Sequence, residues 1–265
     1  MVLSGMIPRP KRFAVVEADP GMESFVSYQF SDWAAAECEK VGVPFIRAKG
    51  PNLYRDLVQL SSTKKTRLDT PPFWTANEDG KEGKLLQKCT AHYKIAPIRR
   101  AVRKELFRLF GIRPNSNAGL SRGCVEQWIG FTADEQSRSD GLEAAKGPAY
   151  CQCSYPLILR GLTKSDIVAI YLANGWPIPV RSMCNACPFH GLRSLKEMHD
   201  ERPSDWLQAV EVDESVRDLT QIGVDRPCFV SRTLKSLLEL AAMDFELPDA
   251  IENDLAQCPT GRCFI

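Results

Sequence analysis

Two short apolar runs on either side of one helical segment place the strongest constraint on the fold of this chain. Residues 13–16 form a continuous apolar run that ends in the turn-forming residues 17–21, and such a run predicts a buried parallel strand. Apolar residues then recur at three- and four-residue steps over residues 23–41, which predicts a helix that stops at Gly42. A second run over residues 43–46 completes a strand–helix–strand unit, which implies a parallel sheet with a right-handed crossover.

Further helices and one more strand follow this unit. Pro97 suits the first turn of a helix, and Thr163, with Asp166 three positions on, predicts a helix N-terminus. The predicted elements are, in chain order, a helix from Pro97 to Gly111, a strand over residues 125–131, a helix from Thr163 to Ala173, and helices near residues 191–199 and 203–218. Residues 61–90 and 139–154 are predicted to form long connections.

The order of these elements predicts an α/β protein. A parallel twisted sheet with flanking helices is expected for residues 1–150, and a small, helical, cysteine-rich part is expected for residues 151–265. The length of 265 residues accommodates one α/β domain with a C-terminal appendage.

The charges of the chain nearly cancel. Lysine and arginine number 34, and aspartate and glutamate number 33, so the net charge is +1 and gives no general attraction to nucleic acid or to an anionic membrane. Any such binding must come from a local patch. The sequence has no apolar run of about 18 residues, so we expect no membrane span. Residues 1–11 lack the apolar stretch of a signal peptide, so we expect a cytoplasmic protein.

Ten cysteines are many for a protein of a reducing compartment, where clustered cysteines more often bind metal or carry out redox chemistry. The sharpest signal is the pair Cys184 and Cys187, because two thiolates separated by two residues can chelate one metal ion or cluster from a single turn. A redox dithiol and two ordinary cysteines are the alternatives. One pair supplies only two ligands, and the candidates for the others are Cys89, His190, Cys258 and Cys263.

The other cysteines give weaker signals. Cys151 and Cys153 form a second pair with a tighter gap, which makes chelation geometrically poorer. We predict structural roles for the remaining ones, since isolated cysteines are usually small buried apolar residues: Cys38, Cys124 and Cys228.

Charged residues at predicted strand and helix ends are the other candidates. Lys94 and Arg99 lie near a helix N-terminus, where cations and free backbone N–H groups suit phosphate, although a solvated helix face gives the same pattern. Asp19 lies at the carboxyl end of the first strand, where ligands bind in parallel sheets, but it also fits a simple turn. The strand over residues 125–131 is followed in the same way by Asp134, Glu135 and Arg138, which would position a substrate or pair with each other.

Taken together, these motifs resemble those of the phosphoadenosine phosphosulfate reductase-like family of PP-loop proteins, especially its phage and bacterial members. The similarity covers most of residues 12–200 and the last few residues. The matching pieces are residues 18–21 with Glu23, residues 42–45, residues 71–75, Gly80 and Gly83, Cys89 and Thr90, residues 93–95 with Pro97 and Ile98, residues 130–138, residues 155–158, Ser182 with residues 184–189, and residues 258–263.

The resemblance implies a sheet of the adenine-nucleotide α-hydrolase type. It also implies chemistry on an adenylated or sulfated nucleotide or nucleic acid, by an oxidoreductase or a sulfur transferase. Relatives that thiolate DNA and RNA hold iron–sulfur clusters with cysteines placed like Cys89, Cys184 and Cys187, which implies a 4Fe–4S cluster here, with zinc as the alternative. We expect Cys263 to be a further ligand or a nucleophile. The residues expected to act in catalysis are Asp19, Arg138 and Cys263, and those expected to bind the nucleotide are Lys94, Arg99, Asp134 and Glu135.

One piece of the family pattern has no counterpart here. The family's phosphate loop, a Ser-Gly-Gly-x-Asp-Ser type turn after a first strand, would lie ahead of Phe13, where 12 residues stand and a unit of about 30 residues is needed. Because backbone N–H groups of such a loop cradle phosphate, we expect weakened nucleotide binding and a protein partner that supplies the loop or the sulfur. The alternatives are a catalytically degenerate, metal-stabilised binding or assembly subunit, and a zinc-stabilised nucleic-acid binder.

Overall fold

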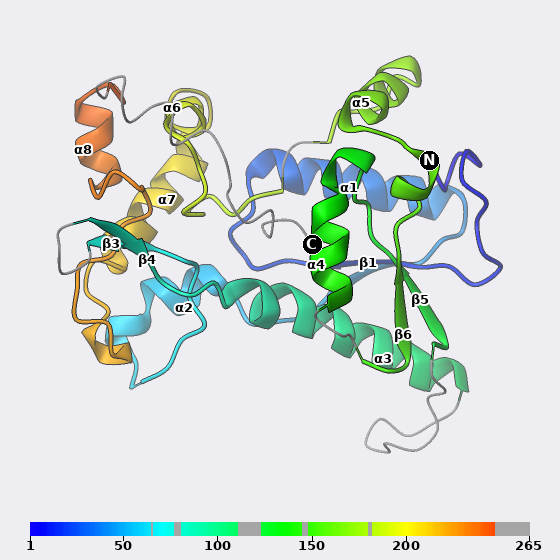
Figure 1. Ribbon diagram of the computed structural model, residues 1–265, viewed down its shortest axis with the longest axis horizontal. Coiled ribbons are helices and arrows are strands. Elements are labelled where there is room, and N and C mark those ends of the chain that lie inside the picture. The colour runs from blue at the N-terminus through cyan, green and yellow to red at the C-terminus, as the bar shows by residue number, and fades with distance from the viewer. Residues whose placement is uncertain (65, 77–80, 111–122, 145–147, 180–181, 247–265) are drawn as a thin grey trace.

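The computed structural model of the chain describes residues 1–64, 66–76, 81–110, 123–144, 148–179 and 182–246. Strands in these residues form two parallel pairs and one antiparallel pair, with helices packed around them (Figure 1). The protein is therefore a mixed α/β protein, as predicted. Instead of one parallel sheet, the described residues contain two separate parallel pairs. In this part of the chain no helix has the length and apolar character needed to cross a membrane.

The predicted strand–helix–strand unit is confirmed. Strand β1 (Val15–Ala18) pairs in parallel with β2 (Phe45–Ala48), and helix α1 (Phe25–Lys40) connects them. The side chain of Ser24 caps the start of α1. Gly42 follows the end of the helix with a φ of +65°, a conformation that glycine adopts without a steric penalty.

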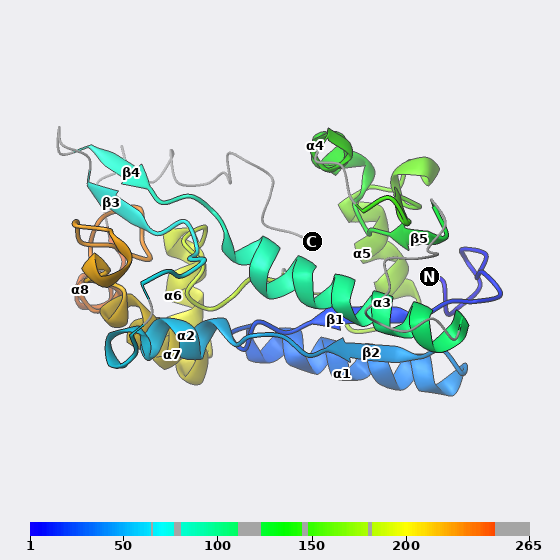
Figure 2. The same ribbon diagram turned by 90° about the horizontal axis from the view of Figure 1, so that it is seen from below.

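The β1–β2 pair lies between two helices (Figure 2). Helix α1 packs on one side, and the long helix α3 (Ala96–Phe110) packs on the other. Pro97 stands in the first turn of α3, as the sequence predicts. Leu106 and Phe107 of α3 are buried, so the charged residues of this helix lie on its outer face.

A second parallel pair consists of β5 (Val125–Trp128) and β6 (Cys151–Ser154), with Val125 opposite Cys151. Helix α4 (Gln136–Ala144) lies between them in the sequence. The prediction that residues 139–154 form a loop is therefore wrong. Strand β6 has only four residues, Cys-Gln-Cys-Ser, and none is β-branched or aromatic, so its conformation depends on pairing with β5, which the local sequence does not signal.

The remaining predicted helices are confirmed. Helix α5 begins at Thr163, and Asp166 completes its capping box. The predicted long connection over residues 61–90 contains a short antiparallel pair, β3 (Trp74–Ala76) and β4 (Glu82–Lys84). The other helices of the described residues are α2 (Leu53–Val58), α5 (Lys164–Ala173), α6 (Leu192–Glu201), α7 (Pro203–Ser215) and α8 (Leu237–Ala242).

The main hydrophobic core lies among α2, α6, α7 and α8, at one end of the molecule (Figure 1). Residues from both sides of position 150 share this core, and the β5–β6 pair also spans that position. The division of the chain at residue 150 stays a prediction. Fully buried side chains from the four helices include Leu57, Leu195, Val212 and Leu237.

Replacing Leu195 with alanine tests this core. Leu195 has no exposed surface, so Leu195→Ala removes buried apolar contacts and leaves a cavity. We expect the free energy of unfolding to fall by about 2–5 kcal/mol, measured by urea denaturation. The control is Leu207→Ala on α7, where the leucine is 66% exposed and the change should stay within about 0.5 kcal/mol. Equal effects of the two variants would contradict the core assignment.

Candidate metal centre

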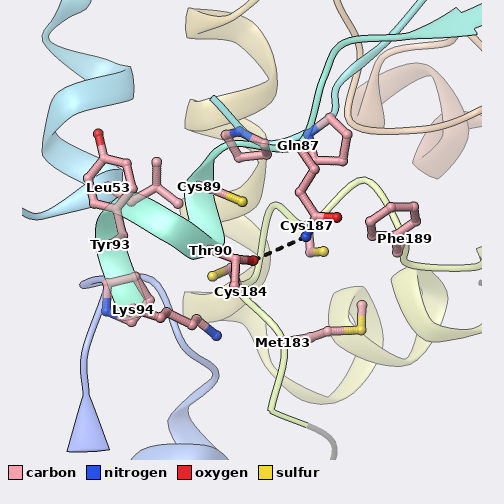
Figure 3. A pocket seen from close by; sticks show the side chains of 13 residues that line it. Leu53, Gln87, Cys89, Thr90, Tyr93, Lys94, Met183, Cys184, Cys187 and Phe189 are labelled. Carbon is pink, nitrogen blue, oxygen red and sulfur yellow. Dashed lines mark hydrogen bonds between the residues drawn. The ribbon is translucent and has the colours of Figure 1, made fainter. Parts of the chain in front are cut away.

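Three of the cysteines predicted as metal ligands lie around one small cavity. Cys89 stands directly before a π-helical turn, Thr90–Ile95, and Cys184 and Cys187 lie in the loop ahead of α6. All three line a cavity of about 40 Å³, and Figure 3 shows their sulfur atoms around a common space. The fold thus brings together thiols that are far apart in the sequence. Cys263, the fourth predicted ligand, and Cys258 lie outside the described residues.

The π-helical turn places two functional side chains at this cavity. Such turns are rare and occur frequently at functional sites. The turn runs directly into α3, and it puts Cys89 and Lys94 on the cavity wall. Tyr93 fixes the turn, since its hydroxyl donates a hydrogen bond to Asp56 Oδ2 at 3.0 Å and its ring is buried.

The loop that carries the paired cysteines is held by hydrogen bonds to the protein. The amide of Cys187 donates to the carbonyl oxygen of Cys184 at 2.9 Å and closes a tight turn. The indole Nε1 of Trp74 donates to the carbonyl oxygen of Pro188 at 2.8 Å. Because Trp74 belongs to β3, this hydrogen bond attaches the loop to that strand.

His190, considered above as a further ligand, has a different orientation. Its Nε2 lies 3.0 Å from the carbonyl oxygen of Cys184, and its Nδ1 lies 2.9 Å from the hydroxyl of Ser194. A carbonyl oxygen only accepts, so Nε2 carries a proton and donates it to this bond. Both ring nitrogens therefore support the loop, and the ring is not part of the cavity wall.

A buried ion pair borders the cysteines. The Nζ of Lys94 lies 2.7 Å from Oε1 of Glu23, and the two side chains are only 15% and 9% exposed. Ser182 donates a hydrogen bond to the other carboxylate oxygen at 3.0 Å, and the sulfur of Cys184 lies 4.0 Å from Glu23 Oε1. Burial alone would lower the pKa of Lys94, but the Glu23 carboxylate is charged and accepts a hydrogen bond from Nζ, which favours the ammonium form, and the pKa is raised. Lys94 is therefore a fixed cation beside the thiols.

Burial also controls the protonation of the cysteines. It raises the pKa of the Cys89 thiol, and Lys94 and Thr90 offset only part of that effect. It raises the pKa of Cys184 well above the ordinary value, again with a smaller opposing effect from Lys94. The unligated thiols therefore keep their protons at neutral pH, and ligation of a metal would release them.

The donor set is chemically suited to a thiolate-bound centre. In the described part of the chain, no group of three or more His, Cys, Asp or Glu side chains is already spaced to hold a single metal ion. A tetrahedral zinc ion requires four ligands with sulfur bonds of about 2.3 Å, so zinc would need the thiols to close in. An iron–sulfur cluster binds its cysteines at different iron atoms and accepts more widely spaced sulfur atoms.

A larger cleft adjoins this centre at the carboxyl end of β1. Its volume is about 380 Å³, which is in the range of small-molecule sites. Lys94 lines both the cleft and the cysteine cavity, so the two adjoin at this side chain. Most of the wall is apolar and comes from Val15, Val16, Ala18, Phe30, Ala34, Phe45, Ile98 and Pro179.

Asp19 lies at the cleft, as predicted, but its carboxylate also has a structural task. Its Oδ1 accepts hydrogen bonds from the amide of Gly21 at 2.6 Å and from the hydroxyl of Tyr28 at 2.8 Å. Gly21 has a φ of +77°, and a Cβ there would lie 2.1 Å from the side-chain nitrogen of Asn52. The turn after β1 therefore requires glycine, and Asp19 holds that turn in place.

The charges of the cleft are mainly negative. Three carboxylates line it, those of Glu17, Asp19 and Glu23. The one cation among its described lining residues is Lys94, which is already paired with Glu23. Glu17 is paired in turn with Arg47, at 3.7 Å. Because both cations already have carboxylate partners, little positive charge is left for a phosphate group, and the cleft suits an uncharged or apolar part of a ligand.

The structure does not bring Asp134, Glu135 and Arg138 to the cysteines, and they line neither cavity. Asp134 accepts a hydrogen bond from the amide of Lys164 at 3.3 Å. Glu135 completes a capping box with Thr132, and Arg138 forms an ion pair with Glu135. Glu135 and Arg138 thus have partners close by in the sequence, and Asp134 contacts the start of α5. The roles predicted for these three residues in the site remain predictions.

Arg99 also lies away from Lys94. Its side chain is exposed on α3, and its charge acts on Tyr150 and Cys151. Ile98, the preceding residue, lines the cleft. Arg99 therefore stands just outside the cleft rim, whereas Lys94 is buried inside.

Sequence reasoning missed Glu23 as a partner in the site. An acidic residue shortly after a strand end was the available signal, but the pairing of Glu23 with Lys94 spans 71 residues.

Comparisons with family models, with curated proteins and with solved structures found no match to this chain. The functional proposal below therefore depends on this geometry and on the motif resemblance.

The buried ion pair gives a stability test. Lys94→Met leaves the Glu23 carboxylate buried without its cation, and we expect the free energy of unfolding to fall by about 3–5 kcal/mol. Adding Glu23→Gln removes the stranded charge, so the double variant should lose less than the sum of the two single variants. The measurement is urea denaturation in a double-mutant cycle.

An exposed ion pair provides the control for that cycle. Lys196 pairs with Asp244, and their side chains are 41% and 73% exposed. Lys196→Met should cost no more than about 1 kcal/mol. A loss for Lys94→Met as small as this would show that the buried pair contributes little to stability.

Proposed function

We propose that this chain is a phosphoadenosine phosphosulfate reductase-like or sulfurtransferase-type protein with a cysteine-bound metal centre. Its substrate is an adenylated or sulfated nucleotide or nucleic acid. The observation that carries the proposal is the meeting of Cys89, Cys184 and Cys187 beside Lys94, at a cavity that adjoins the cleft after β1. The resemblance of the motifs supplies the class of reaction.

The side chains have separate tasks in this proposal. The three thiolates hold the centre, and a 4Fe–4S cluster is favoured over zinc because three thiolates are available. When bound, such a cluster supplies electrons or an iron position open to sulfur. Lys94 offsets the negative charge of the thiolates, and Glu23 keeps the ammonium group in place. Cys263 is the proposed fourth ligand or nucleophile and lies outside the described residues.

The cleft receives the uncharged part of the substrate. Its apolar wall excludes water, and the hydroxyls of Ser27, Tyr28 and Ser182 stand among its lining groups. These hydroxyls offer hydrogen bonds to a base or a ribose. Phosphate groups would lie outside, because carboxylates dominate the cleft.

Cysteine variants test the centre directly. The protein is purified anaerobically and reconstituted with ferrous iron and sulfide, and iron, acid-labile sulfide and visible absorption are measured. We expect a brown protein with cluster-like stoichiometry, and at least a tenfold loss of bound iron in Cys89→Ser, Cys184→Ser and Cys187→Ser. A metal site needs all of its ligands, so the three variants should behave alike.

The matched control is Cys124→Ser, because Cys124 is exposed and does not line the cysteine cavity. It should retain the iron of the unaltered chain. One equivalent of zinc in a colourless protein would support the zinc alternative. A protein that binds neither metal, or that loses iron equally in Cys124→Ser, would contradict the proposed centre.

A second function is favoured by the charge of the cleft. Three carboxylates and one paired lysine give no cradle for a triphosphate, as expected for a catalytically degenerate, metal-stabilised binding or assembly subunit. An equilibrium titration with ATP and magnesium distinguishes the two. Micromolar binding with turnover supports the enzyme, and the absence of binding up to millimolar ATP supports the subunit.

A further inference from the structure

The outer face of α3 carries a row of cations. Three arginines and one lysine stand at spacings of one, three and one residues, which places them over two successive turns of the same face. The opposite face of α3 packs on β1 and β2. Arg99, Arg100 and Lys104 are exposed, and Arg103 is half-buried with its guanidinium 5.5 Å from the ring centroid of Phe107. Its members are Arg99, Arg100, Arg103 and Lys104.

Within the part of the chain that the structure describes, none of these four side chains forms an ion pair. By contrast, Arg108, one turn further on, is paired with Glu105. The row therefore keeps its positive charge locally, although the whole chain has a net charge of only +1. Such a local field attracts a polyanion.

An aromatic ring lies beside the row. Tyr150 directly precedes β6, and Figure 2 shows the strand pair that contains β5 next to α3. Tyr150 is half-buried, and the charges of Arg103 and Arg99 offset part of the rise in its pKa that burial causes. Cations that follow a backbone, together with an aromatic ring for a base, are typical of single-strand binding.

The row also begins where the cleft ends. Ile98 lines the cleft, and Arg99 is the next residue on the helix. The cleft is acidic and the helix face is basic, so the two surfaces suit different parts of one ligand. A nucleotide chain would keep its phosphates on α3 and present one base or nucleoside to the cleft.

We propose that the α3 face formed by Arg99, Arg100, Arg103 and Lys104, together with Tyr150, docks a single-stranded nucleic acid. Guanidinium groups form bidentate hydrogen bonds with phosphate, which favours a nucleic acid over an acidic protein as the partner. An anionic membrane fits less well, because Leu106 and Phe107 of α3 are buried in the fold and Leu109 is the one large apolar side chain of the helix that is exposed among the described residues. This proposal narrows the substrate class of the proposed function to single-stranded nucleic acid, and its link to catalysis rests on that function.

Fluorescence anisotropy with a labelled 15-nucleotide oligo(dT) tests the docking. Four phosphate contacts predict a slope of about −2.8 for log affinity against log salt concentration. Arg99→Gln/Arg103→Gln should lower the affinity at least tenfold and make the slope less steep by about 1.4. The charge-matched control is Arg55→Gln/Arg193→Gln, which removes two exposed arginines from α2 and α6 and should leave both quantities unchanged.

The aromatic contribution has its own variant. Tyr150→Leu should weaken binding of the oligonucleotide about fivefold or more without changing the salt slope, because it removes stacking and no charge. Thermal unfolding of each variant shows whether it is folded. Equal affinity in the α3 variant and the unaltered chain, or an equal loss in the control pair, overturns the proposal. Binding to phosphatidylserine vesicles without binding to the oligonucleotide also overturns it.

The proposed docking and the proposed metal centre can be contradicted independently of each other. Cys187→Ser should lose iron and keep its affinity for oligo(dT), and Arg99→Gln/Arg103→Gln should keep its iron. Loss of iron binding in the unaltered chain would therefore remove the proposed function and leave the docking measurable. Loss of oligonucleotide binding with an intact centre would remove the docking alone.

Discussion

The buried ion pair of Lys94 and Glu23 connects the parts of the molecule that form the site. Lys94 comes from the π-helical turn ahead of α3, Glu23 stands just before α1, and Ser182 and Cys184 reach Glu23 from the cysteine loop. Removing both charges from water is costly, and a well-packed apolar pair of similar size often replaces such a pair without loss of stability. Stability alone therefore does not account for it. A fixed cation beside three thiols has a chemical use, since it offsets the negative charge that the thiols acquire on ligation.

Local sequence patterns predicted those elements that depend mainly on neighbours in the chain. The β1–α1–β2 unit follows from apolar periodicity, and α5 follows from the capping box at Thr163. Strand β6 was missed because it has four residues, none of them β-branched or aromatic, and because the strand exists through pairing with β5. In the site, the two-residue gap between Cys184 and Cys187 is visible in the sequence. The position of this cysteine pair next to Cys89 was expected from the family resemblance. The contact between Lys94 and Glu23 spans 71 residues and has no local signal in the sequence.

Electrostatics separates two surfaces that the sequence analysis treated as one. Lys94 and Arg99 were expected to act together on phosphate, since both lie near the same helix N-terminus. The helix turns one of them inward to Glu23 and leaves the other exposed. The carboxylates of Glu17, Asp19 and Glu23 line the cleft together with Lys94. On the outer face of α3, within the part of the chain that the structure describes, the cations from Arg99 to Lys104 form no ion pair with an acidic residue. The same short stretch of chain therefore contributes to an acidic interior and to a basic exterior.

This separation bears on whether the cysteines form a structural or a functional centre. A structural metal site is closed by four protein ligands, and a functional one keeps a position open. The backbone of the loop that carries Cys184 and Cys187 accepts hydrogen bonds from Trp74 and His190. The cavity also shares Lys94 with a cleft large enough for a small molecule. For the proposed centre, a position next to a ligand-sized cleft favours a reactive role over a closed structural one.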